Sequence, residues 1–302
     1  LSGLRVQLSL FSFTFRAMAS HCEVCVYAPN EATARGWSDA AIAEVRRIET
    51  KYSRYRDDSV TTVINRSAGN AAITVDTETA SLLDFAAELH AQSDGAFDLT
   101  SGVLRRAWDF KTGRVPAQAV HDQLLPRVGW SKIEWRSPTL RLRAEMEIDF
   151  GGIGKEYAAD RAAATVVELG GLHGLVNLGG DVRVFGPHAD GQAWRIAVQD
   201  PRGEPGTTIA HLNVPHGAMA TSGDYERYFE HEGRRYSHLL DPRTGWPVGH
   251  WRSVSVVAPL AIAAGACSTV AMLKPVNDAL QFLQAQRVRY LAIDCAGRQY
   301  SM

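Results

Sequence analysis

Glycine and acidic residues gather in three short segments of the chain. These are Asp149-Phe-Gly-Gly-Ile-Gly-Lys-Glu-Tyr157, Asn177-Leu-Gly-Gly-Asp181 and Ala220-Thr-Ser-Gly-Asp-Tyr-Glu-Arg227. Glycines let a backbone come close to a ligand, and the free N–H groups at the start of a helix bind phosphate. Because the first segment precedes a predicted helix, Lys155 is placed to meet an anion. The three segments therefore indicate a site for a phosphorylated ligand.

None of these segments matches a standard nucleotide fingerprint. The first has no G-K-[ST] of a Walker loop, and Tyr157 stands where a dinucleotide-binding motif has its third glycine. A separate candidate is His238-Leu-Leu-Asp241, because a histidine three residues before an Asp-Pro turn can serve as an acid or base. The alternative is a surface histidine beside a turn. Spacing alone predicts no more than the binding of something phosphorylated.

The charge balance narrows the class of partner. The chain has 302 residues, with 32 basic and 33 acidic side chains and a formal net charge of -1. Proteins that bind nucleic acid usually carry a basic excess, so we expect no nucleic-acid partner. Cys22 and Cys25 lie in an alternating segment that predicts a strand, where residues three apart face opposite sides. We therefore expect neither a redox pair nor a zinc site there.

The chain contains no run near the roughly 18 apolar residues of a membrane-spanning helix, so no integral membrane span is expected. The first residues lack the apolar core of about 7–15 residues that defines an export signal. Alternation of Leu4, Val6, Leu8 and Leu10 predicts a strand instead. As the chain stands, a cytoplasmic location is predicted. A periplasmic or membrane-anchored protein stays open as the alternative if the true N-terminus is missing, because the chain begins with Leu rather than Met.

Helices and strands must position the glycine-acid segments. Apolar spacing predicts helices over about 38–52, capped by Ser38 or Asp39, and over 78–92, 155–169 and 259–274, with one more capped by Asn277. Alternation predicts strands over 132–135, 140–148, 194–198, 254–256 and 290–293. This irregular order predicts an α+β fold with mixed or antiparallel sheets flanked by helices. One domain over 1–302 is expected, with 1–13 as a possible extension.

Taken together, these segments resemble the ApbE family, the FAD:protein FMN transferases. Further family motifs are matched by Met18-Ala-Ser20, Ser53-Arg-Tyr-Arg-Asp-Asp-Ser59, Ser93-Asp-Gly-Ala-Phe-Asp-Leu-Thr100 and the segment from His238 to Pro247. Each motif is weak by itself. The matches follow the family's order from about residue 14 to the end of the chain. All the motifs in this order are together specific for the family.

The resemblance implies an enzyme that binds FAD and Mg²⁺, transfers FMN to a Ser or Thr of an acceptor protein and releases AMP. It implies catalytic roles for His238 and Asp241. By motif position, the residues that line the flavin nucleotide are Met18, Tyr55, Ala96, Phe97, Asp98, Asp149, Lys155, Asp181, Leu239 and Leu240. Structural alternatives remain, since Phe97 can be core packing and Asp98 and Asp149 can cap backbone.

The sequence departs from the family at the metal site. Gly265-Ala-Cys-Ser-Thr269 lacks the Asp of the family's D-A-x-x-T, and the hydroxyl of Thr269 is a weaker magnesium ligand than a carboxylate. Glu156 replaces a glycine of the family's D-x-G-G-[IF]-A-K-G-Y. We therefore predict a metal site formed by Thr269, Gly152 and Glu156, with Glu156 supplying the missing anion. The alternative is that Glu156 is a solvated residue in the first turn of its helix.

Two other functions stay open on the sequence. One is an FAD pyrophosphatase, in which water replaces the protein hydroxyl. The other is a non-catalytic FAD-binding protein that lost the metal carboxylate. Gly265 favours the second of these, whereas the presence of His238, Asp241 and Thr269 opposes it.

Overall fold

The computed structural model describes residues 7–204 and 206–302. The described chain divides into two compact units. Unit 1 comprises residues 7–50, 153–204, 206–221 and 255–265, and unit 2 comprises residues 51–152, 222–254 and 266–302. Neither unit is one continuous stretch, because two helices and two strands pass from one unit into the other. These are α1 (Glu31–Tyr52), α6 (Ala261–Leu273), β10 (Gly217–Gly223) and β13 (Trp251–Ala258).

Unit 1 contains an antiparallel sheet that starts with two hairpins. Neighbouring strands follow the order β1 (Ser9–Ala17), β2 (Ser20–Ala28), β6 (Gly174–Leu178), β7 (Asp181–Gly186), β10 and β13. Ala17 pairs with Ser20 and Leu178 pairs with Asp181, so a two-residue turn closes each hairpin. A separate hairpin joins β8 (Trp194–Gln199) to β9 (Thr208–Val214). Residues 9–13, predicted as part of an extension, belong to β1. Leu4 and Val6 lie outside the described residues.

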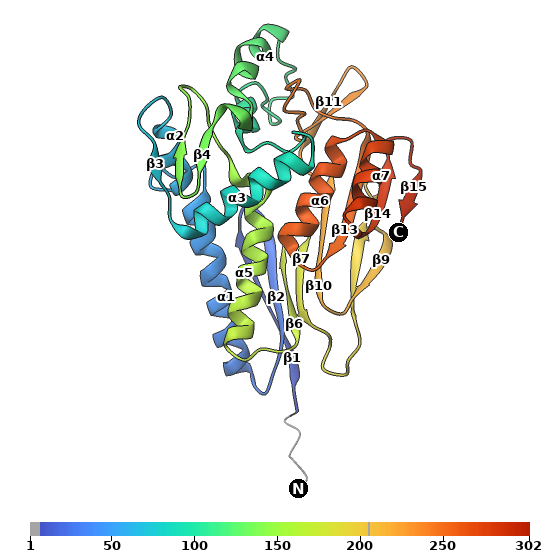
Figure 1. Cartoon of the computed structure of the whole chain (residues 1–302). Helices are drawn as coiled ribbons and strands as arrows, with labels where there is room; N and C mark the ends of the chain where they lie inside the picture. The colour runs from blue at the N-terminus through green and yellow to red at the C-terminus, as the bar shows by residue number, and fades with distance from the viewer. Residues whose placement is uncertain (1–6, 205) are drawn as a thin grey trace. The chain divides into compact units, whose positions relative to one another are not determined.

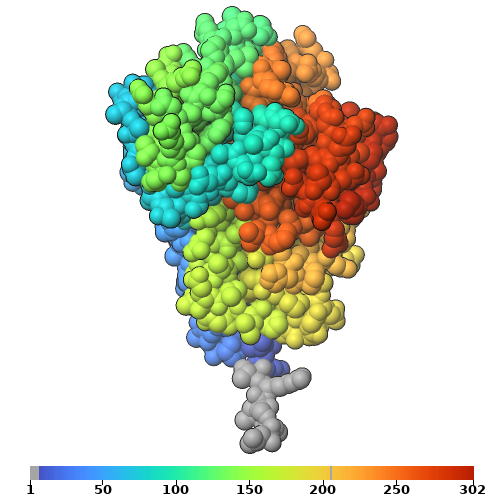
Figure 2. Space-filling view, in the orientation of Figure 1, coloured from blue at the N-terminus to red at the C-terminus, as the bar shows by residue number. Residues whose placement is uncertain are grey.

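Helices α1 and α5 (Gly154–Glu168) lie along the unit 1 strands (Figure 1). The side of α5 that is turned to the protein carries small, buried residues, namely Ala158, Ala159, Ala162 and Ala163. Small side chains let a helix pack closely on β6 and β7. Part of α5 stays on the molecular surface, where it appears yellow-green in Figure 2.

Helix α1 begins earlier than the sequence predicts. Asn30 Oδ1 accepts a hydrogen bond from Thr33 N at 2.9 Å, which is the contact of a helix cap. Ser38 is buried inside the helix, so the predicted cap at Ser38 or Asp39 is wrong. The signal is misleading because serine and aspartate favour caps in general, whereas here α1 continues through them.

Unit 2 contains three small groups of strands and several short helices. Its strands are β3 (Ile73–Thr74), β5 (Thr139–Arg141) and β4 (Glu134–Arg136) in one sheet, β11 (Tyr228–His231) with β12 (Arg234–Ser237), and β13 beside β14 (Arg289–Asp294) and β15 (Gln299–Ser301). Its α-helices are α2 (Val60–Arg66), α3 (Thr77–Gln92), α4 (Gln118–Leu124) and α7 (Val276–Ala285). Its 3-10 helices are η1 (Leu99–Arg106), η2 (Leu125–Arg127), η3 (Trp130–Lys132) and η4 (Phe150–Gly152).

Most of the longer predicted elements are confirmed. The predictions for α3 and α5 agree with the structure within one residue at each end, and the predicted strands at 194–198, 254–256 and 290–293 lie within β8, β13 and β14. The prediction for 259–274 corresponds to α6. The predicted α+β class with antiparallel sheets is also confirmed. The single domain over 1–302 stays a prediction.

Three local predictions are wrong in whole or in part. The strand predicted over 140–148 ends at Arg141, because Met146 N donates to Arg143 O and Glu145 has a φ of 65°. The strand predicted over 132–135 is η3 followed by β4. Asn277 does not cap α7, which starts at Val276 after Pro275. The short helices α2 and α4 were not anticipated. In the described part of the chain, no helix is long and apolar enough to cross a membrane.

Candidate functional site

The turn between β1 and β2 places Met18 in unit 1. Met18 and Ala19 have φ values of 50° and 57°, as a tight two-residue hairpin turn requires. Met18 N donates to Glu49 Oε1 at 2.5 Å, which anchors the turn to α1. A residue other than glycine at a positive φ is strained, so Ala19 adopts this conformation at a cost.

The turn between β6 and β7 lies against the β1–β2 turn. Gly179 and Gly180 have φ values of 63° and 99°, and Gly180 N donates to Asn177 Oδ1 at 2.9 Å. A Cβ atom on Gly179 would lie 2.6 Å from Ser20 Oγ, so no larger residue fits between the two turns. Asp181, the first residue of β7, follows directly and is buried.

The N-terminus of α5 lies beside these turns. Its capping position, Ile153, provides no side-chain hydrogen bond to the first turn. The Lys155 ammonium lies 2.8 Å from Asp181 Oδ2. Burial raises the pKa of Asp181 by more than the Lys155 charge lowers it. The structure thus brings Lys155 and Asp181 together in unit 1. Their role in binding the nucleotide stays a prediction.

Glu156 is buried in the first turn of α5, with 8% of its surface exposed. The alternative of a solvated residue is therefore wrong. Its Oε2 atom has no hydrogen-bond partner among the described residues. Burial raises the pKa of Glu156 above its ordinary value, and the neighbouring Asp181 charge raises it further, while Lys155 acts in the opposite direction.

In unit 2, Asp98 caps the start of η1. Asp98 Oδ1 accepts from Thr100 N at 2.8 Å and from Thr100 Oγ1 at 2.6 Å, and Oδ2 accepts from Trp130 N at 2.8 Å. Both oxygens therefore hold the chain's own backbone, which is the structural alternative that the sequence left open. Ala96 and Phe97 beside it are buried.

Asp149 also stabilises a turn in unit 2. It accepts from Gly151 N at 2.9 Å and forms an ion pair with Arg54. Arg54 in turn donates to Tyr55 Oη at 2.8 Å, and Tyr55 is 83% exposed. The Asp149 segment packs against the Asp98 segment, because Asp149 N donates to Leu99 O at 3.0 Å.

The segment from His238 to Pro247 forms a closed turn in unit 2. Gly245 N donates to Asp241 O at 2.8 Å, and Asp241 N donates to Trp246 O at 2.9 Å. Arg243 binds both carboxylate oxygens of Asp241, with Nε 3.0 Å from Oδ1 and Nη2 2.9 Å from Oδ2. His238 is half-buried, and its Nδ1 lies 3.3 Å from Arg227 O.

A cluster of aromatic rings packs against this turn. Trp108 Nε1 donates to Gly245 O at 2.8 Å, and the Trp108 ring packs against Trp246 and Tyr236. Buried His121 stacks on Trp246 with a centroid distance of 4.4 Å. Leu240 packs on the apolar cluster around Leu104, so its side chain contributes to the core of unit 2; Leu239 is half-buried.

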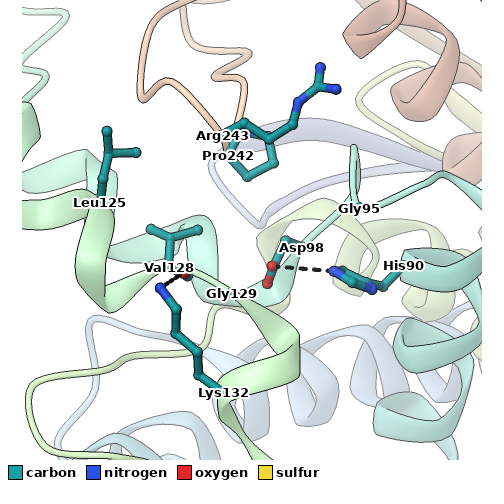
Figure 3. A pocket seen from close by; sticks show the side chains of 9 residues that line it. All are labelled: His90, Gly95, Asp98, Leu125, Val128, Gly129, Lys132, Pro242 and Arg243. Carbon is teal, nitrogen blue, oxygen red and sulfur yellow. Dashed lines mark hydrogen bonds and ion pairs between the residues drawn. The ribbon is translucent and has the colours of Figure 1, made fainter.

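A cavity of about 330 Å³ opens in unit 2 between the Asp98 segment and the Asp241 turn (Figure 3). Asp98 lies at its wall, with an oxygen 3.6 Å from His90 Nε2. Lys132 and Arg243 also line it, but Lys132 Nζ donates to the backbone O atoms of Pro126 and Val128, and Arg243 is paired with Asp241. The cavity therefore has a polar lining of both charge signs. The lining residues are His90, Gly95, Asp98, Leu125, Val128, Gly129, Lys132, Pro242 and Arg243.

The predicted metal ligands are distributed over both units. Gly152 and Thr269 belong to unit 2, and Glu156 belongs to unit 1. A Cβ atom on Gly152 would lie 3.0 Å from Phe97 Cε2, and Thr269 Oγ1 lies 3.1 Å from Ser222 Oγ. Over residues 7–204 and 206–302, no group of three or more His, Cys, Asp or Glu side chains is arranged to hold a metal ion.

Two polar residues of this region were not predicted. Arg54 forms the ion pair with Asp149, and Ser222 contacts Thr269 and Ser268. Both lie inside motifs that the sequence comparison used, namely Ser53–Ser59 and Ala220–Arg227. The position of both residues inside these motifs could have marked them as site residues. An arginine or a serine by itself does not indicate which contact it makes.

The chain resembles known proteins along most of its length. A family model described as the ApbE family matches residues 18–292. The FAD:protein FMN transferase of Salmonella typhimurium is 31% identical over 250 residues, which cover 78% of this chain and 70% of that protein. The crystal structure of the apbe protein from Thermotoga maritima has a TM-score of 0.90 at 31% identity and covers 97% of both chains.

The flavinyl transferase ApbE of Pseudomonas stutzeri is also similar, with a TM-score of 0.86 at 26% identity over 98% of this chain and 95% of that one. The family model covers far more than half of the chain, and the fold agrees with the family's solved structures. This chain belongs to the ApbE family.

Proposed function

We propose that this protein is a transferase that moves FMN from FAD to a Ser or Thr hydroxyl of an acceptor protein and releases AMP. The observation that carries the proposal is the similarity to FAD:protein FMN transferases over most of the chain, in sequence and in fold. In the reaction, the acceptor oxygen forms a bond to the FMN phosphorus. The P–O bond to the AMP phosphate breaks, and AMP leaves.

The start of α5 supports the binding of the FAD pyrophosphate. Ile153 leaves the first turn without a side-chain cap, and free N–H groups at a helix N-terminus attract phosphate. Lys155 adds a positive charge at the same place. Met18 and Asp181 would complete this part of the nucleotide site.

Unit 2 offers the remaining candidates for nucleotide contact. Exposed Tyr55 can stack on a ring, and the loops of Ala96, Phe97, Asp98 and Asp149 give a stable wall. Because both oxygens of Asp98 hold backbone, we propose that Asp98 shapes the site. Leu239 and Leu240 would contribute apolar surface.

His238 is the candidate for proton transfer. With Nδ1 donating to Arg227 O, Nε2 carries the lone pair that can accept the proton of the acceptor hydroxyl. Asp241 would act as a positioning residue, because Arg243 holds its carboxylate and the backbone around it closes the His238 turn.

The residues of unit 1 fit a magnesium ion. Glu156 has a buried carboxylate oxygen without a partner, and carboxylate oxygen is the ligand that Mg²⁺ prefers. When bound, Mg²⁺ would offset the charge that develops on the leaving phosphate. The roles of Gly152 and Thr269 as metal ligands stay predictions from the family resemblance. The cytoplasmic location predicted from the sequence stays a prediction.

One incubation distinguishes the transferase from its alternatives. The protein is mixed with FAD, Mg²⁺ and a protein that carries the acceptor motif of the family, and the products are separated. Covalent flavin on the acceptor with equimolar AMP supports the transferase. Free FMN with AMP would instead identify a pyrophosphatase, and intact bound FAD would identify a carrier.

A further inference from the structure

Glu156 and Gly265 share one space in unit 1. An ideal Cβ atom on Gly265 would lie 2.5 Å from Cγ, 2.6 Å from Oε1 and 2.8 Å from Cδ of Glu156. Such distances are far shorter than van der Waals contact. The carboxyl group of Glu156 therefore fills the volume in which any side chain at position 265 would begin.

The glycine at position 265 is explained by this contact. Gly265 lies within α6, where glycine costs about 1 kcal/mol relative to alanine. Its backbone has no positive φ that would demand glycine. Space for the Glu156 carboxyl group is thus the feature that requires glycine here.

The two neighbouring acids of Glu156 are each paired with a base, so Glu156 is the third acid in a group with two bases. Lys155 pairs with Asp181 at 2.8 Å, and Arg183 pairs with Asp160 at 3.0 Å. Asp160 also accepts from the N atoms of Ala261 and Ile262 at the start of α6. Among Lys155, Arg183, Asp160, Asp181 and Glu156, three are acids and two are bases.

The Glu156 carboxyl group is incompletely satisfied. A buried polar atom without a hydrogen bond costs free energy, more so when it carries charge. Oε2 of Glu156 is such an atom, while the two neighbouring acids have bases within hydrogen-bond distance. The group therefore needs either a proton or an additional cation.

We propose that Glu156 is the acidic ligand for a divalent cation in unit 1, and that it does from α5 what a carboxylate at position 265 would do from α6. This inference rests on the proposed function, in which the cation serves FAD. Hard carboxylate oxygen points to Mg²⁺ or Mn²⁺.

One carboxylate ligand can suffice for this class of cation. Mg²⁺ sites commonly use one or two carboxylates and complete their coordination with water and substrate phosphate. A cluster of three or more acidic, His or Cys ligands is absent from residues 7–204 and 206–302. Water, and phosphate oxygens when FAD is bound, would fill the other positions.

Mn²⁺ binding measured by electron paramagnetic resonance tests the proposal. Mn²⁺ is titrated into the protein alone and into the protein saturated with FAD. Glu156→Gln removes the charge and keeps the shape, so Mn²⁺ affinity should fall at least about tenfold in both titrations. Glu168→Gln, on the exposed end of the same helix, is the matched control and should bind Mn²⁺ as the parent does.

An exchange variant removes the ambiguity of a folding defect. Glu156→Gly combined with Gly265→Asp returns a carboxylate to the same space from the other helix. It should restore Mn²⁺ affinity to within about threefold of the parent, whereas Glu156→Gly alone should not. Recovery with the pair and loss with the single variant would support the proposal.

The proposal is overturned if Glu156→Gln binds Mn²⁺ as tightly as the parent, or if the parent binds none. FAD binding is measured separately, by flavin fluorescence without metal. A protein that binds FAD but shows no dependence of Mn²⁺ on Glu156 would contradict this inference and leave the proposed function standing. A protein that binds Mn²⁺ through Glu156 but never binds FAD would contradict the proposed function alone.

Discussion

The side chain of Glu156 and a side chain at position 265 would occupy the same space, so only one of them can be present. The space beside Gly265 is filled by the Glu156 carboxyl group. The sequence shows both substitutions but not their contact, since 108 positions separate them and burial depends on the packing of α5 against α6. The sequence therefore left open whether Glu156 is a ligand or a solvated residue, and its burial excludes the solvated alternative.

We expect Gly265→Asp alone to destabilise the protein by about 1–3 kcal/mol, because it overpacks a filled space and adds a second buried acid. Chemical denaturation monitored by tryptophan fluorescence measures the change. The same substitution in a Glu156→Gly background should be far less costly. Equal stability of Gly265→Asp and the parent would contradict the close packing of residues 156 and 265.

His238→Gln should lower the rate of FMN transfer by about 10²–10⁴-fold, the usual contribution of a general base. FAD affinity should remain within about threefold, because Gln keeps a polar side chain of similar size and the turn is closed by backbone hydrogen bonds. Single-turnover transfer and a separate FAD titration measure the two effects. A variant that transfers at the parental rate would remove His238 from the mechanism.

At the scale of single elements, sequence signals were sufficient where at least one end of a helix is marked locally. Asp76 caps α3 through Thr79 N, and Gly170 follows α5 with a φ of 99°. By contrast, Leu142, Met146 and Ile148 are buried in alternation without forming a strand, because no partner strand continues beyond Arg141. Alternating apolar residues indicate which side chains are buried. The segment forms a strand only where a second strand is available for backbone hydrogen bonds.

Helix α3 should show a defined dependence of stability on pH. Burial alone would raise the pKa of Asp76, but hydrogen bonds from Lys51 and Thr79 lower it to about 2. The ordinary pKa of an aspartate in an unfolded chain is about 4. An acid whose pKa is lowered by folding stabilises the fold when the pH is above that ordinary pKa. This contribution disappears as the pH falls from about 4 to 2.

Asp76→Asn keeps the cap and removes the charge. At pH 6 it should reduce the free energy of unfolding by about 1 kcal/mol or less, because the Asp76 side chain is 46% exposed. The difference from the parent should shrink when urea denaturation is repeated at pH 3. Glu88→Gln on the exposed side of α3 serves as the control. A difference that grows with acidity would contradict the lowered pKa.

The turn that carries His238 depends on the aromatic cluster beneath it. Trp108→Phe keeps a large ring but removes the donor to Gly245 O, so a buried carbonyl loses its partner. The expected cost is about 1–3 kcal/mol. Thermal unfolding measures it, with Trp135→Phe as a control, because Trp135 donates to exposed Asp84. Equal effects of the two substitutions would argue against a specific role for the Gly245 contact.

At the scale of the whole molecule, the order of motifs carried more information than any single motif. The ordered matches predicted the family and the α+β class, and both are confirmed. They could not predict how each side chain is used. Both oxygens of Asp98 and of Asp241 hold the protein's own backbone or Arg243, which residue types in a motif do not reveal.

The near-neutral charge of the whole chain also agrees with this reading. A formal charge of -1 suits a protein that binds one dinucleotide through a local site such as the start of α5. Recognition of the acceptor also involves the whole molecule, because an acceptor protein contacts far more of the enzyme's surface than its reacting hydroxyl group does.

The proposed transfer of FMN is tested by intact-mass spectrometry of an acceptor protein after incubation with this enzyme, FAD and Mg²⁺. We expect that the acceptor gains the mass of one FMN moiety, that equimolar AMP appears, and that replacing the acceptor Ser or Thr with Ala abolishes both. An acceptor of unchanged mass, while FAD stays intact or is cut to free FMN, would contradict the proposed transfer.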